Sequence, residues 1–195
     1  MIEDAAASCI QNVERALGIR LDYQPETLPL LDHYLETSRP LVQGKPAVLA
    51  LLAQTAGAYL GEVVRRRYPS WWRIEGDDPS EYRIEFETVF LAVNPVRIIV
   101  AALIYDALGT LPSSPKESIE SSDTDLAQLI LDEDERDAVI ARLAELPAVS
   151  EQEYYAPSTR LEVIDIVVDA LRGRRMADGE GEQSEIRLTK DDYDH

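Results

Sequence analysis

A long uncharged stretch from Pro46 to Gly61 constrains the fold of this chain more than any other feature. Apolar residues occupy every side of the helix that it would form, which is typical of a helix buried all round. Three arginines at 65–67 follow, where they complement the negative end of the helix dipole, and Pro69 stops the helix. The sequence therefore predicts one long helix from about Pro46 to Tyr68 at the centre of the fold.

The same stretch has to be weighed as a membrane span. It is only about as long as the shortest spans, contains Gln54 and Thr55, and has Lys45 at its entrance. Gly57 and Gly61 have the spacing at which another backbone can approach a helix closely. We therefore expect a buried helix of a soluble domain, with a neighbour packed closely against these two glycines.

Hydrophobic periodicity predicts further helices on both sides of the central one. They are expected over residues 2–17, 26–38, 94–108 and 123–146, the last divided near the acidic run 132–135, and from about residue 158 onward. The pair Asn94-Pro95 has the residue types of a helix start.

A change of period predicts a sheet. Apolar and charged residues alternate over Tyr82–Phe90, as in a half-buried strand, and residues 73–75 could pair with it across a turn. One strand continuing to Ile104 is the alternative, but Pro95 would interrupt its hydrogen bonds. We expect a mainly helical α+β fold, with five or six helices around a small antiparallel sheet.

Length and composition divide the chain of 195 residues into two parts. Residues 1–176 are expected to form a single globular α+β domain. Residues 177–195 contain seven acidic side chains against Arg187 and Lys190, a composition that predicts a disordered acidic tail.

Charge limits the classes of partner. With 37 acidic and 19 basic residues, the formal net charge is −18, which repels nucleic acid and acidic membrane surfaces and suits a basic protein partner.

The single cysteine, Cys9, lies on the apolar face of the first helix, so we expect a buried thiol. The first residues lack the pattern of a signal peptide, so the expected location is the cytoplasm.

Catalytic and metal-binding patterns are scarce. His33 and His195 are the only histidines, which argues against metal sites built from cysteine and histidine. The sequence has no nucleophile elbow, phosphate loop or dinucleotide-binding fingerprint. We therefore predict no catalytic residue, no metal and no cofactor.

Three glutamates deserve separate consideration. Glu62 directly follows the apolar run of the central helix and lies three residues before Arg65. An ion pair between the two residues is favoured over a catalytic role for Glu62. Glu85 and Glu87 share one face of the predicted strand and are expected to face solvent. The alternative is an oxygen-rich cation site that they form with Glu62.

The segment after the central helix combines arginine with tryptophan, the residue types that dominate protein interfaces. The predicted interaction residues are Arg65, Arg66, Trp71, Trp72 and Arg73. A purely structural interpretation stays open, in which the arginines neutralise the helix end and nearby acids while the tryptophans close the core. Stacking on single-stranded nucleic acid is disfavoured by the overall charge.

The string Gly57-Ala58-Tyr59-Leu60-Gly61-Glu62, followed by Trp72, a strand and Asn94-Pro95, resembles a pattern in small bacterial domains of unknown function. The resemblance covers about the middle third of the chain. It implies a similar α+β arrangement and brings no activity to these positions.

Three hypotheses of function follow. The leading one is a non-enzymatic cytoplasmic protein-interaction domain, either a regulatory adaptor or an immunity-type inhibitor of a basic protein. The alternative is an enzyme or small-ligand domain with Tyr59, Glu62 and Arg65 in a pocket beside the strand. The third is a structural homo-oligomer that assembles through Gly57 and Gly61.

Overall fold

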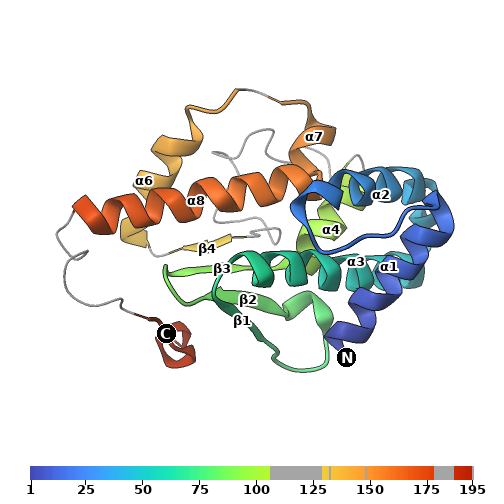
Figure 1. Ribbon diagram of the computed structural model, residues 1–195, viewed down its shortest axis with the longest axis horizontal. Helices are drawn as coiled ribbons and strands as arrows, with labels where there is room; N and C mark the ends of the chain where they lie inside the picture. Colours follow the sequence, from blue (N-terminus) through green and yellow to red (C-terminus); the bar gives the residue numbers. More distant parts are fainter. Residues whose placement is uncertain (106–128, 132, 148, 178–186, 195) are drawn as a thin grey trace.

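A computed structural model shows a mainly helical α+β fold, as the sequence predicts (Figure 1). It describes residues 1–105, 129–131, 133–147, 149–177 and 187–194. The α-helices in this part of the chain are α1 (Ile2–Leu17), α2 (Leu28–Val42), α3 (Pro46–Arg67), α4 (Pro95–Ile104), α6 (Glu133–Leu143), α7 (Glu151–Tyr155) and α8 (Pro157–Ala177). Its strands are β1 (Ser70–Arg73), β2 (Arg83–Phe86), β3 (Leu91–Val93) and β4 (Leu129–Leu131), and its 3-10 helices are η1 (Pro25–Thr27), η2 (Pro79–Glu81) and η5 (Lys190–Tyr193).

Helix α3 is the central helix that the sequence predicts. Nearly every residue from Leu52 to Val64 is buried, and α1 and α4 pack along it. A Cβ atom added at Gly57 would lie 2.8 Å from the Cα atom of Val96, so the backbone of α4 approaches α3 closely there. Of the described helices, α3 alone is long and apolar enough to cross a membrane, and most of it is covered by the rest of the chain.

The four strands form one antiparallel sheet in the order β1-β2-β3-β4. The prediction of a single strand over Tyr82–Phe90 is wrong, because the chain reverses after Phe86 and returns as β3. The reversal places all three residues of β3 in the core between β2 and β4. Alternating hydrophobicity reports which face a residue occupies and does not report where a strand turns back.

Two further boundaries differ from the sequence-based expectation. Leu129 and Ile130, expected in a helix, lie in β4 and pair with β3, since a short apolar run suits a strand as well as a helix. Residues 106–128, which include the predicted end of α4 and the start of the next helix, lie outside the described part. Helix α2 continues through Pro40 to Val42. The proline removes one backbone hydrogen bond and its ring crowds the carbonyl four residues earlier, a cost that the burial of Val42 helps to offset.

The C-terminal residues 187–194 are packed on the sheet, so the prediction of a disordered tail is wrong for them. The amide of Leu188 donates to the carbonyl of Glu87 at 2.8 Å. The buried ring of Tyr193 stacks on Phe90, with ring centroids 4.6 Å apart. One buried aromatic side chain therefore anchors an otherwise acidic segment, while residues 178–186 and 195 lie outside the described part.

The hydroxyl of Tyr193 has backbone partners on both sides of the β2–β3 turn. It accepts from the amide of Leu91 at 3.1 Å and lies 2.8–3.1 Å from the carbonyl oxygens of Phe86, Val89 and Leu91. Burial is the largest cause that raises the pKa of Tyr193 to about 12, so the hydroxyl keeps the proton that it donates.

Candidate interaction surface beside strand β1

Trp71 and Trp72 lie next to each other in β1 and therefore point to opposite faces of the sheet. Trp72 faces α3, where its indole nitrogen donates to an oxygen of Glu62 at 2.9 Å. Trp71 faces the other way, and its indole nitrogen donates to Glu85 at 2.8 Å. Both rings are half-buried, so neither indole is sealed inside the core.

Glu62 is held by two neighbours. Its carboxylate is almost completely buried and accepts two hydrogen bonds from Arg65, at 3.0 and 2.8 Å, besides the one from Trp72. Burial alone would raise the pKa of Glu62, but these hydrogen bonds and the nearby arginine charges together hold it below its usual value. The predicted ion pair with Arg65 is confirmed, and the carboxylate is ionised near neutral pH.

An open groove of about 500 Å³ runs beside β1. It lies between the start of α1, the ion pair of α3, and β1 with the residue that follows it. The lining residues are Met1, Ile2, Glu3, Glu62, Arg65, Ser70, Trp71, Trp72 and Ile74. No residue of β2 lines the groove, so it lies along the outer edge of the sheet.

The backbone of β1 presents hydrogen-bonding groups to this groove. The amide of Glu87 donates to the carbonyl of Pro69. Because hydrogen-bonded pairs alternate along an antiparallel ladder, the backbone N–H and C=O groups of Trp71 then face Glu85 of β2. The N–H and C=O groups of Ser70 and Trp72 consequently point to the outer edge. Within the described part of the chain, no group hydrogen-bonds to these two amides.

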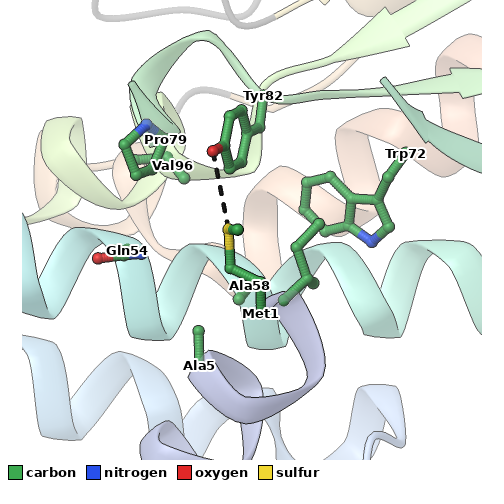
Figure 2. Close-up of a pocket in the computed structure, with 9 residues that line it drawn as sticks. Met1, Ala5, Gln54, Ala58, Trp72, Pro79, Tyr82 and Val96 are labelled. Atoms are coloured by element: carbon green, nitrogen blue, oxygen red, sulfur yellow. Dashed lines mark hydrogen bonds between the residues drawn. The ribbon is translucent and has the colours of Figure 1, made fainter. Parts of the chain in front are cut away.

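A much smaller cavity lies on the other side of Trp72. Figure 2 shows the side chain of Met1 reaching between Trp72 and Tyr82, with the Tyr82 hydroxyl 3.9 Å from the Met1 sulfur. The remaining space is about 10 Å³, near the least volume that one water molecule needs. Trp72 therefore separates the packed core from the open groove.

Tyr59 and Arg66 belong to another part of α3. The Tyr59 hydroxyl accepts from the amide of Tyr23 at 3.0 Å and lies 3.2 Å from the Thr27 hydroxyl. The guanidinium of Arg66 lies over the Tyr23 ring, 3.7 Å from its centroid. Tyr59 is buried and does not line the groove, so the structure does not bring Tyr59 and Glu62 together in one pocket.

Arg73 and Glu85 secure the opposite face of the sheet. Arg73 donates to the carbonyl of Lys190 at 3.0 Å and forms an ion pair with Asp194, so it holds the C-terminal segment. Glu85 is completely buried and accepts from Arg83 at 2.8 Å in addition to Trp71. The prediction that Glu85 faces solvent is wrong, because the segment 187–194 and the two arginines cover and neutralise it.

The cation site predicted from Glu62, Glu85 and Glu87 is not formed. The hydrogen bonds from Trp72 and Trp71 place Glu62 and Glu85 on opposite faces of the sheet. Among the residues that the structure describes, no group of three acidic, histidine or cysteine side chains could hold a metal ion.

The structure thus divides the predicted interaction residues. Arg65, Trp71 and Trp72 line the groove, whereas Arg66 packs on Tyr23 and Arg73 holds the C-terminal segment. Sequence reasoning missed Met1, Ile2, Glu3, Ser70 and Ile74, which also line it. No local pattern could reveal the first three, because only the packing of α1 on α3 brings them to β1.

Comparisons with protein-family models, with curated proteins and with solved structures found no match to the chain. The resemblance to small bacterial domains therefore stays an expectation, and the candidate site rests on its own geometry.

Proposed function

We propose that this protein is a non-enzymatic cytoplasmic interaction domain, and that it binds an extended segment of a partner protein in the groove beside β1. The observation that carries the proposal is the open edge of β1, where the backbone groups of Ser70 and Trp72 face a groove with apolar and aromatic walls. An extended peptide can add a strand to such an edge, with main-chain hydrogen bonds for affinity and side-chain pockets for specificity.

The walls of the groove favour an apolar anchor on the partner. Ile74 is 50% exposed and Met1 is 78% exposed, so both have apolar surface to bury against a ligand. Trp72 adds a half-buried aromatic ring, and Arg65 is 40% exposed with its charge balanced by Glu62. Burial of one large apolar side chain contributes about 1.5–3 kcal/mol.

The charge of the whole chain favours a basic partner. A formal charge of −18 attracts basic proteins over the distance at which they first meet and excludes acidic ones. The partner segment is therefore expected to alternate apolar side chains, which enter the groove, with basic side chains, which face the acidic surface.

Ile19 provides a matched control for Ile74. Both isoleucines are 50% exposed, and Ile19 lies beyond the other end of α1, about 24 Å from the groove by the length of that helix. Peptides selected from a random displayed library should lose about tenfold or more in affinity with Ile74→Lys, a loss of about 1.4 kcal/mol. Ile19→Lys should leave the affinity unchanged.

Backbone pairing has a separate test. N-methylation of alternate peptide amides should abolish binding in one register and spare it in the other, since only alternate amides face β1. Selected peptides that bind Ile74→Lys as tightly as the wild type, or that tolerate N-methylation at every position, would refute the proposal.

The structure gives no support to assembly through the glycines of α3. A Cβ atom at Gly57 would meet Val96, and one at Gly61 would lie 2.2 Å from the Trp72 ring. Both glycines are therefore covered by neighbours within the same chain.

A further inference from the structure

Arg160 is a buried arginine with no anionic partner among the residues that the structure describes. It lies in the first turns of α8, is 2% exposed, and is one of the largest completely buried side chains. Its Nε and Nη1 atoms have no hydrogen-bond partner within the described part of the chain. Its guanidinium lies over the ring of Tyr154, 4.9 Å from the centroid, and no described residue hydrogen-bonds to the buried hydroxyl of Tyr154.

The cost of this arrangement points to a missing group. An arginine side chain cannot release its proton to escape burial. Removing a charge from water carries a large penalty, which the face of a tyrosine ring offsets only in part. Water could satisfy the hydrogen bonds, but only an anion would also neutralise the charge.

Asp32, a carboxylate at this end of α8, is engaged elsewhere. Asp32 accepts from the amide of Ser158 at 3.2 Å and from its hydroxyl, so it caps the helix. Burial is the largest cause that raises the pKa of Asp32, which further weakens it as a source of negative charge. The positive end of the α8 dipole adds to the attraction for an anion.

The surroundings of Arg160 are aromatic, which strengthens any charge interaction made there. Tyr154 meets Tyr155 edge to face at 4.8 Å, and Tyr155 stacks on Tyr105 at 5.7 Å. We propose that Arg160 and Tyr154 form a binding site for a small oxyanion, a phosphate or carboxylate group, between α7 and α8. This site is independent of the groove beside β1.

Thermal unfolding at constant ionic strength tests the proposal, with sodium chloride replaced stepwise by sodium phosphate or by sodium acetate. The wild type should gain roughly 5–10 °C in Tm at an anion concentration a hundred times Kd. Phosphate stabilises most proteins non-specifically, so the specific effect is the gain beyond that of Arg160→Met. Arg142→Met, which removes an exposed arginine, is the control and should respond like the wild type.

The two anions separate the two sources of the oxyanion, since a phosphate site and a carboxylate site respond to different salts. In chloride, the Tm of Arg160→Met should match or exceed that of the wild type, because the substitution removes an uncompensated charge. In the salt whose anion binds, the wild type should have the higher Tm. Equal responses of all three proteins to both salts would overturn the proposal. If Arg160→Met fails to fold, Tyr154→Phe takes its place in the Tm comparison and should weaken binding. In that case binding is also measured directly, as saturable broadening of the ³¹P signal of phosphate or of the proton signal of acetate by the wild type. No broadening by either anion would overturn the site.

Discussion

The contact between Gly61 and Trp72 yields the sharpest prediction on stability. A Cβ atom at residue 61 would lie 2.2 Å from the Trp72 ring and 3.0 Å from the Ile84 side chain, so the indole has to move. Overpacking of this kind costs about 1–3 kcal/mol. Displacement of the indole also breaks its hydrogen bond to the ionised Glu62, which is worth about 1.5–3 kcal/mol.

Helix propensity acts in the opposite direction, since alanine is favoured over glycine by about 1 kcal/mol inside a helix. We therefore expect Gly61→Ala to lower the free energy of unfolding by about 1.5–5 kcal/mol. Urea unfolding followed by tryptophan fluorescence measures the change. The fluorescence of the native state should change as well, because the Trp72 indole loses its place.

Gly173 in α8 provides the control. A Cβ atom there meets nothing within 4 Å, so Gly173→Ala should stabilise the protein by about 0.5–1 kcal/mol. A double-mutant cycle with Trp72→Phe should show a coupling of about 0.5 kcal/mol or more, since the two residues are in contact. A Gly61→Ala protein as stable as Gly173→Ala would refute the close packing of Trp72 on α3.

Three further predictions concern buried polar groups. Tyr193→Phe should lower the free energy of unfolding by about 1–3 kcal/mol, because it leaves the amide of Leu91 without its acceptor. Urea unfolding measures this loss, and an unchanged midpoint would argue against the anchoring of residues 187–194. The pKa of Glu62 is lowered from the usual 4.5, so its ion pair stabilises the protein above pH 4.5, and this stabilisation is lost as the pH falls through the lower folded-state pKa. The difference in free energy of unfolding between wild type and Glu62→Gln should therefore shrink on acidification. A difference that stays constant would contradict the ion pair. Burial raises the pKa of Cys9 to about 12, so a thiol reagent near pH 8 should modify it only after unfolding, and rapid reaction of the native protein would contradict its burial.

Local features of the chain were predictable from the sequence. The apolar run of α3 could only be buried, and Asn94 caps α4 by accepting from the amide of Arg97 at 3.0 Å. The pair Glu62–Arg65 is also local, since the two residues are three apart on one helix. These features depend on neighbours within about one helical turn, which a sequence records directly.

The candidate groove was only partly predictable. Its residues with a local signal, Arg65, Trp71 and Trp72, stand out by residue type, but the face that each indole occupies depends on where β1 begins. Met1 and Ile74 reach the groove because α1 packs back along α3, and no periodicity in either segment indicates that.

The sequence by itself determined the central helix, the Asn94 cap of α4 and the α+β class, because these follow from hydrophobic period and backbone stereochemistry over short stretches. Only the tertiary structure decided that Glu85 is buried, that Tyr193 anchors the C-terminal segment and that β4 completes the sheet. Each of these depends on contacts between distant parts of the chain, such as the pair Arg73–Asp194, 121 residues apart. Such contacts carry no local pattern, since a side chain's own sequence neighbours do not reveal which distant segment will cover it.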